Sequence, residues 1–195
     1  MLCKLNVKDK PYSFTNIENT IGVIHIVRDP RNIITSLKNH FSFENDGQAI
    51  KFMTNDNSTI GLDENKIPQF LSSWNNHYNS WKRFPKNYIL IRYEDLILDT
   101  KKEIKKLIDY LNNFFDFTVL NTDLERMINN SSFNNLKELE RKGLFSENAI
   151  NVKTGEVKSF FNLGHNNDWK KILEDETKKI IEKNFQKEMQ ELKYL

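Results

Sequence analysis

The sequence predicts an α/β fold in which a parallel sheet is flanked by helices. Two short apolar runs, at 22–27 and 88–93, have the length and composition of buried strands. An amphipathic helix is predicted after each run, and strands that alternate with helices favour parallel pairing. Two strands are few for such a sheet, so we expect further strands to lie before Met1.

The length and composition indicate one compact domain over residues 1–195. The chain of 195 residues is long enough for a single core, and 38% hydrophobic with 29% charged residues is typical of a globular chain. The net charge of +2 is too small to indicate nucleic acid as a partner. Any bound anion must therefore be held by residues in particular positions.

The cysteine content and the termini bear on the cellular compartment. Cys3 is the single cysteine, which excludes an internal disulfide and fits a reducing compartment. No apolar run has membrane-spanning length, and the first ten residues, MLCKLNVKDK, lack the apolar core of a signal peptide. We therefore expect a cytoplasmic protein with no membrane partner.

The rest of the chain is mostly helical in its pattern, with one long loop. Residues 42–66 contain clusters of Asp, Asn, Gly and Ser with weak periodicity, which predicts a long loop with room for one short helix. A loop of this length in a compact domain is usually functional or mobile. The apolar spacing predicts helices over about 68–82, 123–129, 132–142 and 174–192.

A candidate anion site lies at the end of the first predicted strand. Arg28 ends this strand, Asp29 and Pro30 suit the cap and first position of a helix, and Ser36 lies two turns into that helix on its polar face. A guanidinium fork beside the free N–H groups of a helix start can form a phosphate site. The alternative is that Arg28 pairs with Asp29 or Asp95 and that Ser36 is merely solvated.

The four histidines are poor candidates for catalysis. His25 is expected to be a satisfied residue inside a buried strand, and His77 lies on the packed face of its helix. His40 and His165 have no evident partner. No His and Cys cluster has the spacing of a metal site, and no Gly-x-x-x-x-Gly-Lys loop is present. We therefore expect no metal and assign no catalytic residue.

Motifs in a fixed order along the chain resemble the sulfotransferases that use 3′-phosphoadenosine 5′-phosphosulfate (PAPS). They are IHIVRDPRNIITS (24–36), a Trp-x-x-His-x-x-x-Trp segment (74–81) with YEDL (93–96) after it, SSFNNLKE (131–138) and NDWKKIL (167–173). The similarity runs from about residue 20 to the carboxy terminus. It implies a P-loop-kinase-like sulfotransferase fold and the transfer of a sulfuryl group from PAPS to a hydroxyl or amine acceptor.

The resemblance also implies which residues contact the PAPS nucleotide. Arg28 and Ser36 match the family residues that hold the 3′-phosphate. Tyr93 matches the residue that contacts the adenine, with simple packing of the strand end as the alternative. The segment 131–138 matches the part of the family that surrounds the adenine, through Ser131, Phe133 and Leu136. An aromatic residue followed three positions later by leucine is more often plain core, so the order of the motifs supports this match more than its composition does.

The sequence departs from the family in the loop before NDWKKIL. The family usually reads Arg-Lys-Gly-x-x-Gly-Asp-Trp-Lys there, and its basic pair closes over the 3′-phosphate. Asn162 and Leu163 stand in place of that pair, and Gly164 is kept. Asn162 can still donate a hydrogen bond and the Gly164 backbone can approach an anion closely. Two charge-assisted contacts worth about 1.5–3 kcal/mol each are lost, for which Lys153 or Lys158 could compensate.

The segments that carry the family's chemistry are not found in residues 1–20. These are a Pro-Lys-x-Gly-Thr-Thr loop and a Lys-Thr-His strand with the general base, so the resemblance implies a truncated chain that is inactive alone. The alternatives are a catalytically inactive fragment that binds a nucleotide or a partner, and a helical interaction protein with fortuitous matches. The acceptor, a small molecule or a carbohydrate, and the oligomeric state stay open. We expect marginal stability, because a sheet cut at its centre exposes edges and apolar faces.

Overall fold

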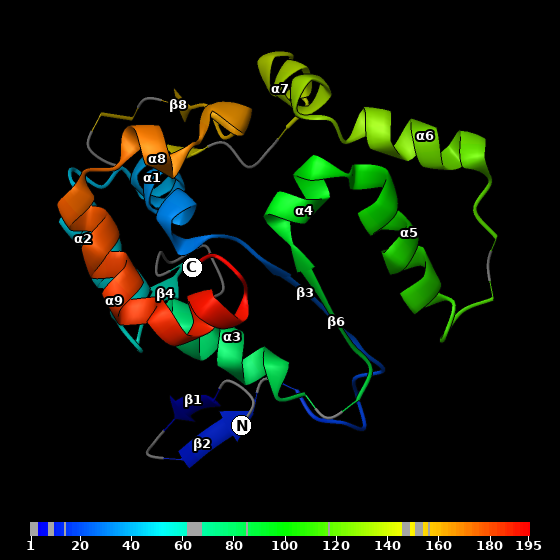
Figure 1. Cartoon of the computed structure of the whole chain (residues 1–195), viewed down its shortest axis with the longest axis horizontal. Coiled ribbons are helices and arrows are strands. Elements are labelled where there is room, and N and C mark those ends of the chain that lie inside the picture. The colour runs from blue at the N-terminus through cyan, green and yellow to red at the C-terminus, as the bar shows by residue number, and fades with distance from the viewer. Residues whose placement is uncertain are drawn as a thin grey trace.

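One pair of parallel strands lies at the centre of the architecture. The computed structural model describes residues 4–7, 10–13, 15–61, 68–84, 86–116, 118–145, 149–150, 154–155 and 157–195. Strand β3 (Val23–Val27) pairs in parallel with β6 (Tyr88–Arg92), residue for residue from one end to the other. Both strands cross the middle of the molecule with helices on either side, which confirms the predicted α/β class (Figure 1).

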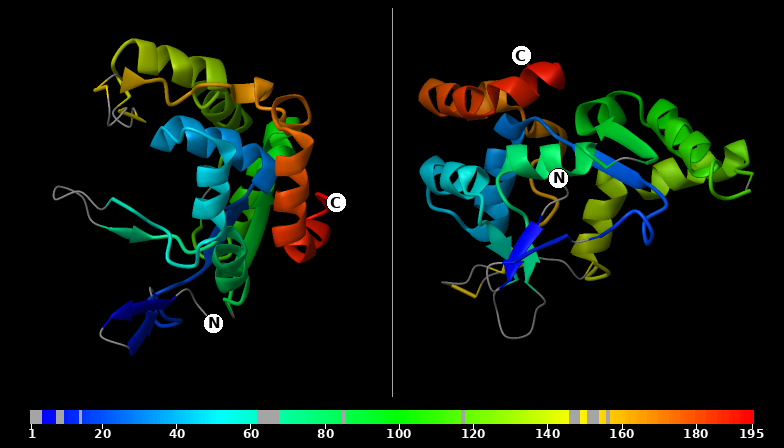
Figure 2. Two further views of the ribbon diagram at one scale, coloured as in Figure 1. Left: turned by 90° about the vertical axis from the view of Figure 1, so that its left-hand side faces the viewer. Right: turned by 90° about the horizontal axis from the view of Figure 1, so that it is seen from below.

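The other described strands form short antiparallel pairs outside this sheet. They are β1 (Lys4–Val7) with β2 (Lys10–Ser13), β4 (Thr59–Ile60) with β5 (Gln69–Phe70), and β7 (Ala149–Ile150) with β8 (Val157–Lys158). The hairpin of β1 and β2 projects from one end of the molecule (Figure 2). None of these pairs extends the central sheet.

Helices account for most of the described structure. Their bounds are α1 Pro30–Phe41, α2 Asp46–Thr54, α3 Trp74–Lys82, α4 Tyr93–Leu98, α5 Thr100–Leu111, α6 Asn121–Asn130, α7 Phe133–Arg141, α8 Trp169–Ile172 and α9 Asp175–Glu191. Helices α6 and α7 lie at the periphery in every view, whereas α1, α2 and α9 pack together (Figures 1 and 2). Within the described part of the chain, no helix combines the length and the apolar character needed to cross a bilayer.

The largest hydrophobic cluster lies between helices and not on the sheet. It joins α1, α2 and α9 through Ile34, Ala49, Met53, Leu173, Ile181, Phe185 and Met189. A second cluster joins the end of β3 to α3 and the carboxy terminus through Val27, Tyr78 and Leu192. Trp74 and Tyr194 pack against both clusters. The carboxy-terminal segment therefore fixes the position of the end of β3, where the candidate anion site begins.

Part of the predicted long loop over 42–66 is occupied by α2, the one short helix for which the sequence left room. Helix α2 begins there after Asn45, whose side chain accepts a hydrogen bond from the backbone N–H of Gln48 at 3.1 Å. The helix is stabilised by tertiary contacts, because Ala49 and Met53 are buried in the main cluster. The sequence could not give the bounds of this helix, because short helices of weak amphipathicity depend on packing more than on local pattern.

The helix predicted over 68–82 begins later than its apolar spacing suggests. Residues 69–70 pair as strand β5 with β4, and the Ser58 carbonyl accepts the N–H groups of Leu71 and Ser72. Ser73 is the residue before the first turn, so α3 begins at Trp74. The apolar residues ahead of Trp74 belong to this β-structure, which competes with the helix for the same backbone groups.

The prediction that residues 22–27 form a buried strand holds for one face of β3 only. Val23, His25 and Val27 are buried, whereas Ile24 and Ile26 are 44% and 57% exposed. On β6, the residue opposite Ile26 is Ile91, which is 3% exposed because α5 packs against β6. Helices therefore cover this face of the sheet over β6 and leave it open over β3.

A buried arginine connects the junction of β3 and α1 to the carboxy terminus. Arg31 is 4% exposed, and its guanidinium donates to both carboxylate oxygens of Asp29 at 2.7–3.2 Å. It also donates to Glu182 Oε1 and to the Tyr194 carbonyl, each at 2.7 Å, and lies 3.7 Å from the ring centroid of Trp169. Every partner lies on a different turn or helix, so this one side chain holds several elements together.

We expect Arg31→Met to lower the free energy of unfolding by about 3–5 kcal/mol, because it leaves two carboxylates without their cation. Arg126→Met is the matched control, since that side chain is 69% exposed and its one ion pair among the described residues is with Asp123, three residues earlier. It should cost less than about 1 kcal/mol. Urea denaturation at neutral pH measures both, and equal losses in the two variants would show that the Arg31 network contributes no more than a surface ion pair.

His25 is a satisfied core histidine, as the sequence predicts. Its Nδ1 lies 2.8 Å from the Tyr88 hydroxyl, and its ring contacts the rings of His77 and Tyr78 with centroids 5.7–5.9 Å apart. Burial, with a smaller effect of His77, lowers the pKa of His25 to about 4. Burial also lowers the pKa of His77. Both side chains are therefore neutral in the folded protein near pH 7.

The lowered pKa values of His25 and His77 predict a loss of folding stability in mild acid. The unfolded chain binds a proton at the ordinary histidine pKa of about 6.5, whereas folded His25 resists protonation until about pH 4. Stability is therefore complete above about pH 6.5 and falls by about 2 kcal/mol between pH 7 and pH 5. Denaturation midpoints across this range should lose most of their slope in His25→Gln, and an unchanged slope would contradict the role of His25.

Candidate functional site

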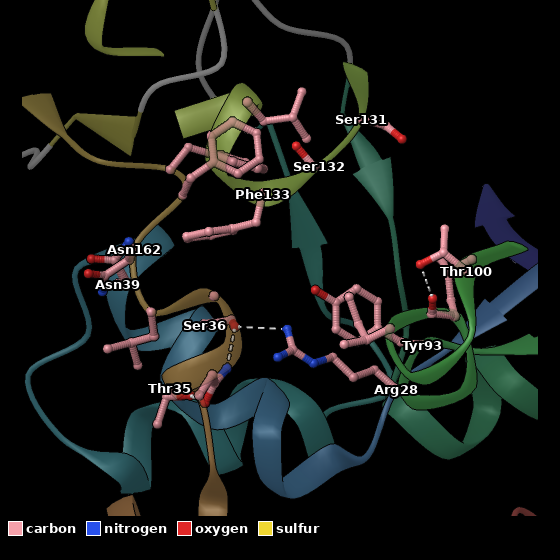
Figure 3. A pocket seen from close by; sticks show the side chains of 18 of the residues that line it. Arg28, Thr35, Ser36, Asn39, Tyr93, Thr100, Ser131, Ser132, Phe133 and Asn162 are labelled. Atoms are coloured by element: carbon pink, nitrogen blue, oxygen red, sulfur yellow. Dashed lines mark hydrogen bonds between the residues drawn. The ribbon is translucent and has the colours of Figure 1, made fainter. Parts of the chain in front are cut away.

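A cavity of about 780 Å³ lies between α1, the first turn of α4, the junction of α6 and α7, and the segment before α8 (Figure 3). The structure brings together in its wall all eight residues predicted for the nucleotide, although they are spread over more than half of the chain. These are Arg28, Ser36, Tyr93, Ser131, Phe133, Leu136, Asn162 and Gly164. Their proximity is an observation, whereas their role in binding stays a prediction.

Arg28 supplies the positive charge of this wall. It follows the last residue of β3, and its guanidinium carbon lies 4.4 Å from the ring centroid of Tyr93. Nη1 makes a long contact of 3.5 Å with Ser36 Oγ (Figure 3). Nε is buried and has no hydrogen-bond partner in the described structure. Arg28 thus retains donor capacity for a group inside the cavity.

The structure excludes the alternative in which Arg28 pairs with a neighbouring carboxylate. Asp29 is bonded to Arg31, and Asp95 lies 3.6 Å from Arg92. No described carboxylate lies within 4.0 Å of the Arg28 guanidinium, and no described residue that lines the cavity is acidic. A buried or half-buried cation without a counter-ion attracts an anion. Arg28 therefore brings a positive charge to the cavity that no described carboxylate of the wall balances.

The expectation of free backbone N–H groups at the start of α1 is wrong. The Asp29 side chain caps the helix by accepting from Arg31 N at 2.9 Å, and the Asp29 carbonyl accepts from the N–H groups of Asn32 and Ile33. The N–H of Asp29 itself donates to Glu94 at 2.9 Å. A well-capped helix start has no donors left for a ligand. An anion in the cavity would therefore be held by side chains.

The opposite wall is aromatic and apolar. Phe133 is the first residue of α7, which Ser132 caps through its side chain, and Leu136 lies one turn later. Phe161 meets the Phe133 ring edge to face, with centroids 6.1 Å apart. Ser131 lines the cavity, but its hydroxyl donates to the Met127 carbonyl at 2.8 Å. This wall offers ring surfaces and few polar groups.

Asparagine side chains attach the segment 159–169 to α1. Asn39 Nδ2 donates to the Ser159 carbonyl at 2.9 Å, and Asn32 Oδ1 accepts from the Trp169 N–H at 3.0 Å. Asn162 and Asn39 both line the cavity (Figure 3). Lys158 does not line the cavity, and Lys153 lies outside the described residues. The expected replacement cation is therefore absent from the described wall.

Glu140 also holds this segment, from α7. Its carboxylate accepts from the Ser159 hydroxyl at 2.7 Å and from the backbone N–H groups of Phe160 and Phe161. These hydrogen bonds hold its pKa below the usual range, against the opposing effect of desolvation. Because Phe133 begins the same helix, the aromatic wall and the segment 159–161 are fixed to one another.

Comparison with known proteins now identifies the family. The sequence model described as "Sulfotransferase domain" matches residues 9–193. The chain belongs to this family. Sulfotransferase 2A1 of Macaca fascicularis is 28% identical over 179 residues, which cover 87% of this chain and 57% of that protein. Sulfotransferase 1E1 of Rattus norvegicus is 24% identical over 198 residues, covering 96% and 60%. The chain thus spans about three fifths of these curated relatives.

A solved structure supports the fold of this sulfotransferase domain. The crystal structure of mouse sulfotransferase SULT7A1 complexed with PAP superimposes with a TM-score of 0.57 at 18% identity. The match covers 86% of this chain and 58% of that one. The predicted fold class is therefore confirmed independently of the sequence motifs.

Sequence reasoning missed several residues of the cavity in this sulfotransferase domain. Thr35 precedes Ser36 on α1, and Asn39 lies about one turn after it. His40 also lines the cavity, against the rings of Phe41 and Phe160. Asn167 was also missed, although the sequence alone shows that it stands in place of the second glycine of the family pattern. In the described residues, no group of three metal-ligating side chains occurs.

Gly164 is required by its contact with Phe133. It has φ +53°, and a Cβ built there would lie 2.5 Å from Cζ of the Phe133 ring. A left-handed conformation disfavours any residue but glycine, and the ring leaves no room for a side chain. The segment before α8 therefore approaches the aromatic wall closely because position 164 is glycine.

Gly164→Ala should lower stability by about 2–3 kcal/mol through backbone strain and the clash with Phe133. Gly143→Ala is the matched control, since Gly143 has φ +71° and no atom within 4 Å of a built Cβ. Gly143→Ala introduces the backbone strain without the clash and should lower the free energy of unfolding by about 1 kcal/mol. In a Phe133→Ala background the two alanine variants should become equal by urea denaturation. A persistent difference would place the cost of Gly164→Ala elsewhere.

Proposed function

We propose that this chain is the part of a sulfotransferase that binds the 3′-phosphoadenosine group of PAPS. The whole enzyme would transfer the sulfuryl group to a hydroxyl or amine acceptor. The observation that carries the proposal is the Arg28 guanidinium, which faces the cavity without a carboxylate partner. The family supports the reaction class. The acceptor, a small molecule or a carbohydrate, belongs to the proposal and is not defined by the described residues.

The polar residues of the cavity fit a phosphate group. Arg28 has a buried Nε without a partner, and its planar fork suits two phosphate oxygens. Ser36 lies next to it on α1 and adds a hydroxyl. Thr35 and Asn39 bring further polar atoms from the same helix. Arg28 and Ser36 would hold the 3′-phosphate, since the backbone groups at the start of α1 are already bonded and the Thr35 hydroxyl and the Asn39 amide donate to Asn167 and Ser159.

The apolar residues of the cavity fit a purine ring. A base can stack on the surface formed by Phe133, Phe161 and Leu136. Tyr93 also lines the cavity, and its ring is in contact with the Arg28 guanidinium. The volume of about 780 Å³ falls within the range of ligand pockets, about 300–1,000 Å³. A base on the aromatic wall and a phosphate at Arg28 would use both sides of the cavity.

We assign binding, and not the chemical step, to the described residues. When bound, PAPS supplies the sulfuryl group for transfer. Such a step needs cationic stabilisation of the leaving oxygen and a base beside the acceptor. Among the described residues that line the cavity, Arg28 is the only cation and His40 the only imidazole, held against two phenyl rings. We therefore propose that the chain alone is inactive, and turnover of PAPS by the isolated chain would refute this part.

Calorimetric titration with 3′-phosphoadenosine 5′-phosphate, the desulfated product, tests the binding site. Arg28→Ala should weaken binding by about 10- to 150-fold, the value of a hydrogen bond to a charged group. Arg28→Lys should recover part of the loss, because a single ammonium lacks the fork. Arg126→Ala, a surface arginine outside the cavity, is the control. Unchanged binding by Arg28→Ala, or no binding by the folded wild-type chain, would overturn the proposed site.

A further inference from the structure

A buried amide in the cavity wall controls the hydroxyl of Ser36. Asn167 is 9% exposed, and each of its polar atoms is bonded to α1. Its Nδ2 donates to the Asn32 carbonyl at 3.0 Å and to Ser36 Oγ at 3.3 Å. Its Oδ1 accepts from the Thr35 hydroxyl at 2.5 Å. The amide thus spans one turn of the helix that carries Ser36.

The Asn32 carbonyl fixes the orientation of this amide. A carbonyl oxygen only accepts hydrogen bonds, so the Asn167 atom 3.0 Å away must be the donor Nδ2. With the amide reversed, two carbonyl oxygens would face each other at that distance. The same Nδ2 then reaches Ser36 Oγ, and Ser36 must act as the acceptor in this pair.

Ser36 is therefore prepared to donate into the cavity. Its Oγ accepts from Asn167 Nδ2 and, over a longer distance, from Arg28 Nη1. A hydroxyl has one proton and two lone pairs, so with both lone pairs occupied the proton points elsewhere. A helical serine can donate to the carbonyl one turn earlier, but the described side-chain donors to the Asn32 carbonyl are Thr35 and Asn167 and not Ser36.

We propose that Asn167 is a positioning residue that keeps the Ser36 proton directed at the 3′-phosphate. This inference rests on the proposed function and goes beyond it by assigning a specificity device. Without the amide, Ser36 could rotate and donate to the Asn32 carbonyl, which would remove it from the ligand. Because Arg28 is the only described cation of the cavity, an oriented neutral donor is valuable for selecting a phosphate monoester over a free hydroxyl.

Two nucleotides that differ only in the 3′-phosphate isolate this effect. Affinities for 3′-phosphoadenosine 5′-phosphate and for adenosine 5′-phosphate should be measured by calorimetry, directly and by competition. Asn167→Ala should weaken the first about fivefold and the second less than about twofold, since only the first ligand accepts from Ser36. Asn166→Ala, an exposed asparagine at the preceding position, is the matched control and should change neither.

The double variant Ser36→Ala/Asn167→Ala separates positioning from general support. If Asn167 acts through Ser36, the double variant should bind the 3′-phosphorylated nucleotide no more weakly than Ser36→Ala alone. Additive losses, or equal losses for both nucleotides, would mean that Asn167 only stabilises the wall and would overturn the proposal. Should Asn167→Ala fail to fold, Thr35→Val removes the donor to Asn167 Oδ1, and the same selective loss is expected.

The two levels of the hypothesis fail in different ways. If the wild-type chain binds neither nucleotide, or if Arg28→Ala leaves binding unchanged, the nucleotide site itself is refuted. If Arg28→Ala weakens binding of 3′-phosphoadenosine 5′-phosphate as expected while Asn167→Ala leaves its affinity unchanged, the site stands and the positioning role is refuted.

Discussion

The pairing of Asp29 with Arg31 is the interaction on which the rest of the structure depends. It caps α1, joins this helix to α9 and the carboxy terminus, and determines which arginine remains available for a ligand. Two arginines three residues apart compete for one carboxylate, and Arg31 takes it inside the core. The Glu94 carboxylate accepts hydrogen bonds from the backbone N–H of Asp29 and from the Tyr194 hydroxyl. Arg28 is left at the cavity with its charge uncompensated because its neighbours are fully engaged with each other.

The fold was predictable where the pattern was strong and local. The apolar runs at 22–27 and 88–93 predicted both strands of the sheet, and Asp29 with Pro30 predicted the start of α1. The bounds of α2 could not be predicted, because its stability comes from burying Ala49 and Met53 against α1 and α9. The exposure of Ile24 and Ile26 could not be predicted either, because an apolar strand sequence does not show which face of the sheet a helix covers.

The members of the candidate site could be predicted better than their hydrogen bonds. Family resemblance placed Arg28, Phe133 and Gly164 together although more than a hundred residues separate the first from the others. It could not show that the donors at the start of α1 are already used, because that follows from the geometry of one cap. The role of Asn167 was equally hidden, since it depends on a contact between segments 131 residues apart. Sequence motifs predict which residues lie close together, whereas the hydrogen bonds that those residues make are seen only in the three-dimensional structure.

The uncovered side of β3 has a consequence for how the protein behaves in solution. Among the described strands, β3 pairs only with β6, so one of its edges and the face with Ile24 and Ile26 are open. Such an edge is a template for another strand. Pairing between two molecules is second order in protein concentration, whereas unfolding is first order. Dilution should therefore slow this association without changing the rate constant of unfolding.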